Sequence, residues 1–585
     1  MERAPTAAPG PGRAAVRAAD AARREGPIWV VTVACALAGL FGCTPESPPA
    51  PRGPPNILLI SLDTVRADHT TPFGSARDTT PVLAALARGG TKFTQAFSQG
   101  NESAYSHASL FTGRYPSELA EPVYETYGVP PAATLASEAL QAYGYQTAMF
   151  SAGGHVTPEF GFDQGWDHAS AEEGFASLYD TGPAALAWID GLRSARAMRS
   201  AAPPTTDDGL DVPPEAQRPW FVFLHGYDAH RPYTRPGPWD HAFADGPGSP
   251  VAELMASSPC ISEMVFGDTF FPELTPGWFT HPGGAQILAP ESYARLEAPP
   301  PGTARVAITA ADRQHVQDHY DGALLYADTL LGQILATLEA RGDLDNTVIV
   351  AVSDHGEDLL DHGFMNHRTC LTDSCTRVPL VVWGPGFTPG AEVSALVDAR
   401  DVAATLFALA RVPPPAGSGG RDLRAVARGE TPVSAVFAEG VMDMVSVRTA
   451  THRLVYRDAP LAAPDYVDVL RAAALDGRQF ELFDLRADPG EHTDVHRDDP
   501  ATTAHLRDAL VTWRTGLARG AYTLAPDAVS AATVASLKAH GYWDAQGGAA
   551  PAAPPPAATR GAVVPVVRPL VDERCADRFA FLEGG

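Results

Sequence analysis

Acidic and imidazole side chains follow two of the apolar runs of this chain, at the point where each run ends. Asp63 closes NILLISLD (56–63), and Asp354 and His355 close or follow NTVIVAVSD (346–354). Such runs are typical of strands buried on both faces. Because parallel strands end at one edge of an open sheet, where ligands bind, we expect these side chains to meet. An imidazole beside two carboxylates favours Mn²⁺, Zn²⁺ or Fe²⁺ and leaves Ca²⁺ possible.

A hydroxyl group could complete this set. The stretch NESAYSHASLFTG (101–113) places Ser103 ahead of a helix that we expect to start near Ser106. A bound cation and the helix dipole would both favour loss of the hydroxyl proton, which makes Ser103 a candidate metal ligand and nucleophile. Serine at such a place is also an ordinary N-cap. Both roles can hold together, with Ser106 as the cap and Ser103 as the reacting group.

The elements that must position these residues alternate along the chain. Further apolar runs at 145–152, 220–226 and 378–384 predict strands, and 312–340 has the apolar spacing of a helix. This alternation predicts an α/β fold, with a mostly parallel sheet sandwiched by helices. From about residue 432, short alternating runs and a final helix near 500–518 predict a smaller C-terminal α+β subdomain.

The length of 585 residues fits this division into a large and a small part. We divide the chain into a lipoprotein-type signal segment (1–43), a Pro-rich linker (44–55), a main domain (56–430) with an insertion at 231–311, a C-terminal subdomain (431–545), and an Ala/Pro linker with a tail (546–585).

Charge and the first segment bear on partners and location. A formal net charge of −26 repels phosphodiester backbones, so we expect no nucleic-acid partner. Arginines precede an apolar run at 28–41 that ends in LAGLFGC, which resembles a lipoprotein cleavage box. We therefore expect an exported periplasmic or cell-envelope lipoprotein, held to the membrane by a lipid anchor on Cys43. The alternatives are an uncleaved anchor or a cytoplasmic protein with a misassigned start.

The other cysteines suit an oxidising compartment. Cys260, Cys370, Cys375 and Cys575 could form up to two disulfides, whose pairing the sequence leaves open. Cys370 and Cys375 are near enough for a local bridge. Their spacing does not match a zinc knuckle.

Six stretches carry a family resemblance: NILLISLDTVRADH, SAYSHASLFTGRYP, LHGYDAHRPY, VSDHGEDLLDHGFMNH, RVPLVVWGPG and ELFDLRADPGE. Their order and spacing resemble those of sulfatases, which belong to the alkaline-phosphatase-like superfamily of metal-dependent ester hydrolases. The resemblance covers roughly 56–495. It implies an alkaline-phosphatase-like fold, one divalent metal ion, with Ca²⁺ or Mn²⁺ favoured, on Asp63, Asp354 and His355, and a nucleophile at Ser103.

The same resemblance implies contacts to the substrate oxyanion from His230 and His367, with His362 as a further candidate. His155 lies near the place where the family has Lys and His contacts. A lone histidine is more often structural, and we give His155 and His225 less weight for that reason.

The chain also departs from the family pattern. Sulfatases carry Cys or Ser followed by x-Pro-x-Arg, which is oxidised to formylglycine, whereas this frame reads Ser103-Ala104-Tyr105-Ser106-His107. Conversion of Ser103 is therefore an open question, and we place His107 with Ser103, His230 and His367 among the catalytic residues. Thr64 stands where the family has a second acid. His367 stands where the family has a late Lys.

These features predict a hydrolase that cleaves a sulfate or phosphate ester with Ser103 or its formylglycine derivative. A formylglycine hydrate can expel sulfate by collapsing to the aldehyde, whereas an unmodified serine suits phosphoryl transfer better. A phosphoesterase or phospho-headgroup transferase with unmodified Ser103 is therefore one alternative. A non-catalytic, sulfatase-like protein that binds envelope glycans is another. The sequence leaves the substrate and the oligomeric state open.

Overall fold

The structure is a computed structural model. It describes residues 53–121, 127–200, 218–244, 246–258, 265–266, 269–270, 306–441, 443–457, 465–525 and 528–539. The predicted signal segment with Cys43, nearly all of the Pro-rich linker, Cys260, Cys575 and the tail lie outside the described residues. Within these ranges, no helix combines the length and apolar character needed to cross a membrane.

The main domain is built on an eight-stranded sheet, with the strand order β13-β2-β12-β9-β1-β5-β3-β4. In chain order, the strands are β1 (Asn56–Leu62), β2 (Thr91–Phe97), β3 (Gln146–Ser151), β4 (His168–Ala171), β5 (Trp220–Gly226), β9 (Thr347–Ser353), β12 (Leu380–Trp383) and β13 (Ala391–Asp398). In this sheet β12 runs antiparallel to β9 and β2, and the other pairs are parallel. The predicted fold class is confirmed.

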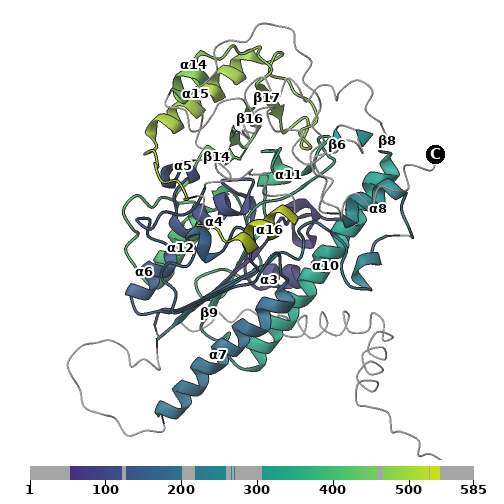
Figure 1. The fold of residues 1–585 in the computed structure, drawn as a ribbon. Helices are drawn as coiled ribbons and strands as arrows, with labels where there is room; N and C mark the ends of the chain where they lie inside the picture. The colour runs from purple at the N-terminus through teal and green to yellow at the C-terminus, as the bar shows by residue number, and fades with distance from the viewer. Residues whose placement is uncertain are drawn as a thin grey trace, which may run out of the picture.

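Helices cover both faces of this sheet (Figure 1). One face packs against α4 (Ser103–Thr112), α6 (Ala136–Ala142) and α12 (Arg400–Ala410). The other packs against α3 (Pro81–Gly89), α7 (Leu178–Ser200) and α10 (Ala310–Ala340). The helix predicted at 312–340 is α10, which begins two residues earlier because Thr309 and Asp312 form a capping box.

Shorter elements connect these layers. They are η1 (Ala67–His69), η2 (Thr71–Phe73), α5 (Pro116–Leu119), η4 (Pro158–Phe160), η6 (Trp239–His241), α8 (Pro250–Ser257), β6 (Val265–Phe266), β7 (Thr269–Phe270), β8 (Val306–Ala307), β10 (Asp358–Leu359), β11 (Met365–Asn366), α11 (Asp373–Thr376), α13 (Leu423–Ala427) and α16 (Ala531–Ala539).

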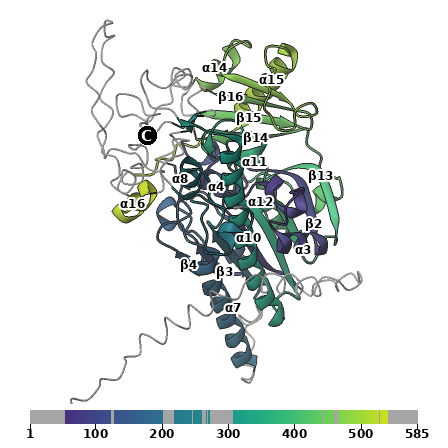
Figure 2. The same ribbon diagram turned by 90° about the vertical axis from the view of Figure 1, so that its right-hand side faces the viewer.

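A four-stranded antiparallel sheet forms the C-terminal subdomain that the sequence predicts. Its strands are β14 (Ala435–Gly440), β15 (Met444–Thr449), β16 (His452–Tyr456) and β17 (Phe480–Asp484). Two helices, α14 (Tyr466–Ala472) and α15 (Pro500–Gly516), pack on it around an apolar core of their own. Figure 2 shows this layer next to the main domain.

A buried arginine joins the two parts. Arg453, on β16, donates from Nε to Glu491 Oε1 at 2.6 Å and from Nη1 to the carbonyl of Leu371 at 2.6 Å, and its Nη2 pairs with Asp373. The side chains of Arg453 and Glu491 are each 1% exposed. Arg448 supports Asp373 from the same sheet. The chain thus links the 371–373 segment of the main domain to the C-terminal sheet by charge-assisted hydrogen bonds.

Replacing Arg453 with Met is expected to lower the free energy of unfolding by about 3–5 kcal/mol, because Glu491 would remain buried without its cation. Urea denaturation measures the change. Arg428→Met is the matched control, since Arg428 pairs with Glu430 on the surface, with both side chains exposed, and its loss should leave the denaturation midpoint nearly unchanged. Equal midpoint shifts in the two variants would contradict the role given to Arg453.

Candidate functional site

The two predicted acidic ligands lie at the carboxyl ends of neighbouring strands. β1 and β9 pair in parallel with Leu62 opposite Ser353, so the next residues, Asp63 and Asp354, leave the sheet side by side. One ligand atom from each of Asp63, Asp354 and His355 lies within 4.8 Å of the others. All three side chains are buried. The structure therefore brings together the residues that the sequence singles out from separate apolar runs.

Ser103 completes the cluster. Its Oγ donates to Asp63 Oδ2 at 2.8 Å and lies 3.4 Å from His355 Nε2. Ser103 is the first residue of α4, so the partial positive charge of the helix N-terminus lies next to its hydroxyl. The predicted meeting of a hydroxyl with two carboxylates and an imidazole is thus present in the fold.

The predicted start of this helix near Ser106 is wrong, as is the capping role of Ser106. The N-cap is Glu102, whose side chain accepts a hydrogen bond of 2.9 Å from the N–H of Ala104. Ser106 lies inside the first turn, where its Oγ is 2.9 Å from Ser98 Oγ and donates to the carbonyl of Gly100 at 3.2 Å. The helix begins earlier because Glu102 is extended and its carboxylate reaches the free N–H groups.

The charges of this cluster are strongly coupled. Burial and the nearby Asp354 raise the pKa of Asp63 well above its ordinary value. Burial also opposes ionisation of Asp354, but the charges of His355 and His107 outweigh it and hold the pKa of Asp354 at about 2. Two buried carboxylates at this separation are ionised together only when a positive partner shares the site.

The donor set fits a divalent cation. Among the described residues, Asp63 Oδ1 and Asp354 Oδ2 are buried without a hydrogen-bond partner. Thr64, in place of a second acid, adds no charge, and its N–H donates to Asp354 Oδ1 at 3.2 Å. Its backbone is left-handed, with φ of 57°, so the chain turns sharply directly after Asp63. Two carboxylates, one imidazole and Ser103 are therefore the ligands that this chain offers.

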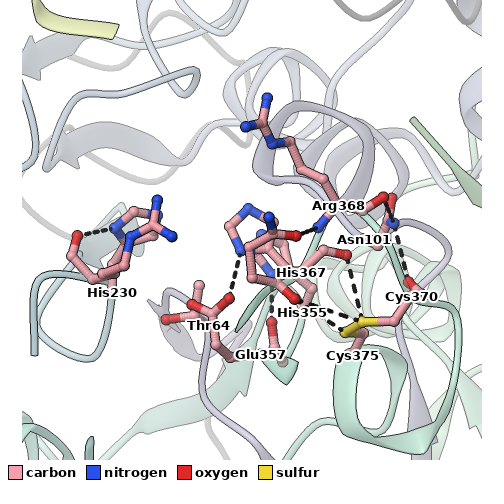
Figure 3. Close-up of polar contacts among 12 residues, drawn as sticks. Thr64, Asn101, His230, His355, Glu357, His367, Arg368, Cys370 and Cys375 are labelled. Atoms are coloured by element: carbon pink, nitrogen blue, oxygen red, sulfur yellow. Dashed lines mark hydrogen bonds and ion pairs between the residues drawn. A yellow bond between two sulfur atoms is a disulfide. The ribbon is translucent and has the colours of Figure 1, made fainter. Parts of the chain in front are cut away.

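His230 and His367 lie around the same centre (Figure 3). The ring centroid of His367 is 4.3 Å from that of His355 and 5.7 Å from that of His230. His367 Nδ1 lies 3.2 Å from Glu357 Oε1, and His230 Nδ1 donates to the carbonyl of Arg231 at 2.6 Å. Burial, with the charges of His355 and His230, lowers the pKa of His367 well below its ordinary value. Both predicted histidines are thus placed where they could face an oxyanion.

His107 and His225 lie next to Ser103 and Asp63, but neither ring makes a hydrogen bond with the Ser103 hydroxyl. His107 Nδ1 is 2.8 Å from the carbonyl oxygen of Ser103, and its Nε2 is 2.9 Å from Ser61 Oγ. Because His107 is one helical turn after Ser103, it meets the backbone of Ser103 and not its hydroxyl. His225 Nε2 lies 3.8 Å from Asp63 Oδ2. Both rings are fully buried, and burial lowers the pKa of each.

His155 pairs with the residue that caps α4, which gives it a structural role. Its Nδ1 lies 2.8 Å from Glu102 Oε1, the carboxylate that caps α4. The ion pair holds the pKa of Glu102 below its ordinary value, against the effect of burial. His155 therefore supports the helix end that carries Ser103.

His362 does not join the oxyanion contacts proposed for it. Its Nδ1 lies 2.8 Å from Asp358 Oδ2 and its Nε2 lies 3.1 Å from the carbonyl of Gly490. Both ring nitrogens face acceptors, which is the arrangement that an imidazolium needs. Although burial opposes the charge, Asp358 outweighs it and raises the pKa of His362 to about 9. His362 therefore belongs to the contact between the two parts of the chain.

This pKa predicts a pH-dependent stability. A histidine with a raised folded-state pKa stabilises the fold fully below its unfolded value of about 6.5, and the stabilisation is lost as the pH rises through about 9. We expect His362→Gln to remove about 2–3 kcal/mol at pH 6 and almost nothing at pH 10. Denaturation at both pH values measures this, with the exposed His492→Gln as control. A loss in His362→Gln that is the same at both pH values would exclude the imidazolium.

Sequence reasoning missed three further residues of the site. Tyr227 is buried against the rings of His225 and His230, and its hydroxyl lies next to that of Ser103. Arg231 Nε and Nη1 are buried and unpartnered in the described part of the chain. Both follow β5 in the stretch LHGYDAHRPY, so the same motif contained the signal. Burial raises the pKa of Glu357, the partner of His367, to about 8.

A disulfide supports the loop that carries His367. Cys370 and Cys375 are bonded, with their Cα atoms 6.0 Å apart, as the local pairing considered from sequence requires. Asn101 donates to the carbonyls of Arg368 and Cys370, both at 3.0 Å, and so ties this loop to the segment before Ser103 (Figure 3).

The sulfatase family profile matches residues 55–412, and the profile of the C-terminal part of N-sulphoglucosamine sulphohydrolase matches 360–515. Arylsulfatase K of Gallus gallus is 23% identical over 484 residues, covering 81% of this chain and 85% of that protein. N-acetylglucosamine-6-O-sulfatase of Bacteroides thetaiotaomicron is 24% identical over 482 residues, covering 75% and 82%.

Solved structures share the fold. An enzyme in complex with its substrate D-glucosamine-2-N,6-O-disulfate has a TM-score of 0.54 at 19% identity, covering 79% of this chain and 97% of the other. Phosphonate monoester hydrolase of Agrobacterium radiobacter has a TM-score of 0.53 at 21% identity, covering 79% and 95%.

The architecture is thus the alkaline-phosphatase-like one, common to metal-dependent ester hydrolases. Within that class the chain belongs to the sulfatase family, whose profile covers more than half of its length. The predicted family and the enzyme class, a sulfuric ester hydrolase, are confirmed.

Proposed function

We propose that this protein hydrolyses a sulfate ester of a sugar at a site for one divalent cation, with Ser103 or its formylglycine derivative as nucleophile. The observation that carries this proposal is the hydrogen bond of 2.8 Å from Ser103 Oγ to Asp63 Oδ2, inside the cluster with Asp354 and His355. The sugar class is supported by the relatives that act on glucosamine derivatives.

Each group of the chain then has a task. Asp63, Asp354, His355 and Ser103 would hold a cation which, when bound, neutralises charge on the oxygens of the ester. The N-terminus of α4 favours the anionic form of the Ser103 oxygen, or of the formylglycine hydrate, next to Asp63. His107, bonded to the Ser103 carbonyl, is a positioning residue.

On the other side of the ester group, the side chains around His230 would donate hydrogen bonds to its oxygens. His230 orients the ester group or protonates the leaving oxygen, and His367, whose lowered pKa keeps it neutral, orients the ester group. The buried guanidinium of Arg231 adds hydrogen bonds that the described residues leave unused, and the Tyr227 hydroxyl lies next to that of Ser103. Burial, aided by the charge of Asp63, raises the pKa of Tyr227 well above its ordinary value, so its hydroxyl remains a donor.

A neighbouring cavity of about 520 Å³ suits the sugar part of the substrate. It is lined by Gly154 and polar residues such as Thr157, Glu172 and Ser536 of α16. Gly154 also packs directly on Tyr227 of the site, because a Cβ there would lie 2.2 Å from the Tyr227 hydroxyl. Hydroxyl and carboxylate side chains offer the hydrogen bonds that a sugar ring needs.

Phosphate-ester hydrolysis by unmodified Ser103 is the second candidate, and one observation favours it. Tyr105 and His107, at the positions of the family's Pro and Arg, are both fully buried. Tyr105 packs on Tyr127 with ring centroids 4.3 Å apart. The departure from the modification motif is therefore part of the core packing, and the stretch differs from the usual oxidation signal at both of these positions.

Mass analysis separates these chemistries. Trypsin releases residues 93–114 as one peptide that contains Ser103. Loss of two hydrogens from this peptide supports formylglycine and a sulfatase reaction, and an intact serine supports phosphoryl transfer. The same protein is assayed on aryl sulfate and aryl phosphate with Mn²⁺ or Ca²⁺. Hydrolysis of neither ester would overturn the proposal and favour the non-catalytic, glycan-binding alternative.

We also propose that the protein is exported and anchored by a lipid on Cys43. The bonded pair Cys370 and Cys375 supports export, because such disulfides persist in oxidising compartments. Cys43→Ser should move the protein from the membrane fraction to the soluble fraction. An unchanged distribution would contradict the anchor.

A further inference from the structure

A second cluster of possible metal ligands lies where α8 packs against α10 (Figure 1). His315 and His319 are one turn apart on α10 and therefore project from the same face of the helix. Their Nε2 atoms are 3.1 Å apart, and His315 Nε2 is 3.2 Å from Glu253 Oε1 on α8. One ligand atom of each of the three residues lies within 4.8 Å of the others.

Protons alone do not satisfy this arrangement. A neutral imidazole carries one proton, so His315 Nε2 cannot donate to Glu253 and accept from His319 at once. If His319 Nε2 is the acceptor, its proton is on Nδ1, and that atom is buried without a partner among the described residues. His315 and His319 are 8% and 2% exposed as residues, so water does not readily supply the missing hydrogen bond. A cation among the three ligand atoms resolves it.

The surroundings orient the ligands. The N–H of Gly248 donates to Glu253 Oε1 at 2.8 Å, which fixes the carboxylate. A Cβ on Gly248 would lie 2.6 Å from the His315 ring, so the backbone of Gly248 packs directly against the imidazole. The Glu253 side chain is 43% exposed, which leaves a path from solvent to the ligand atoms.

We propose that Glu253, His315 and His319 form a second metal site, for a transition-metal cation of the Zn²⁺ class. Two imidazoles and one carboxylate are a set typical of Zn²⁺, with a further position for water. A cation there clamps α8 to α10 and is separate from the cluster at Asp63. This inference does not depend on the proposed ester hydrolysis.

The clamp would support the rim of the active site. At the end of α8, the carbonyl of Ala256 accepts a hydrogen bond of 2.9 Å from the N–H of Tyr233, three residues after His230. On α10, Tyr320 follows His319 directly and donates to the carbonyl of Thr64 at 2.7 Å. Both helices are thus bonded to loops that carry site residues, and a bound cation would hold those loops in one arrangement.

The test uses the full exported chain without a histidine tag, in an Asp354→Asn background that weakens the other cluster. Zn²⁺ alone is titrated by calorimetry, and Co²⁺ is used for the visible spectrum of a low-symmetry site with nitrogen ligands. We expect the parent to bind one equivalent of Zn²⁺ at this site and to gain thermal stability from it. His319→Ala should lose this equivalent, and Glu253→Gln should bind at least about 10-fold more weakly.

Two controls make the outcome decisive. His505→Ala removes an exposed histidine of α15 and should change neither Zn²⁺ binding nor the Co²⁺ spectrum. Glu253→Gln should fold normally, because this side chain is partly exposed and glutamine has nearly the same size. A loss of Zn²⁺ binding in this variant therefore cannot be explained by misfolding. With Asp354 intact, Glu253→Gln should keep the thermal midpoint of the metal-free parent but gain no stabilisation from Zn²⁺. Zn²⁺ binding that is absent from the parent, or unchanged in His319→Ala and Glu253→Gln, would overturn the proposal.

Discussion

Ser103→Ala is expected to reduce ester hydrolysis by on the order of 10⁴-fold or more, as removal of a catalytic nucleophile does. Alanine keeps the first position of α4 and removes only Oγ, the atom that donates to Asp63 Oδ2. Because alanine is a good helix former, the secondary structure and thermal midpoint should change little. Steady-state rates on aryl sulfate and aryl phosphate measure the effect.

Ser106→Ala is the matched control for this variant. Ser106 is in the same helical turn, is also buried, and has hydrogen bonds of its own to Ser98 and Gly100. Removing the Ser106 hydroxyl disturbs packing but removes no group that touches the cluster, so activity should stay within about 10-fold of the parent. The comparison therefore separates a general structural effect from the loss of a nucleophile. Activity of Ser103→Ala at the level of Ser106→Ala would remove Ser103 from the reaction.

The meeting of Asp63 with Asp354 could be predicted because it depends on strand direction alone. β1 and β9 are continuous apolar runs, and their parallel pairing places the next residues at one edge. β2 and β13 were missed because partly exposed polar residues interrupt their apolar pattern, as in TKFTQAF. In such a segment the apolar residues neither form a continuous run nor alternate strictly with polar ones, so the sequence carries no clear strand signal.

The start of α4 could not be read in the same way. Glutamate is not a usual N-cap, and the serines that follow it are, so the sequence favoured Ser106 over Glu102. The start of the helix is fixed by a tertiary contact, in which His155, far away in the sequence, holds the carboxylate of Glu102. Arg231 was missed for a related reason. An arginine in a loop reads as a surface residue until the fold buries it beside His230.

Asp354→Asn is expected to weaken binding of Mn²⁺ or Ca²⁺ and to lower hydrolysis by on the order of 10³-fold, because a buried anionic ligand of the proposed cation is lost. Asparagine keeps an acceptor for the N–H of Thr64 and of His355, which Asp354 Oδ1 now serves at 3.2 and 2.8 Å. The loop should therefore keep its shape. Calorimetric titration with Mn²⁺ and turnover on both aryl esters measure the two losses.

The stability of this variant should differ from that of the parent mainly when the metal ion is present. In the presence of EDTA, loss of the Asp354 charge eases ionisation of the buried Asp63 but removes an anion that His355 and His107 stabilise, so the thermal midpoint should change little. With Mn²⁺, the parent should gain stability and Asp354→Asn should not. Asp358→Asn is the control, since Asp358 is buried in the same loop but bound to His362. If Mn²⁺ stabilised the parent and Asp354→Asn equally, the cation would have to bind elsewhere. Asp354 would then contribute nothing to cation binding, although its charge dominates the electrostatics of the cluster.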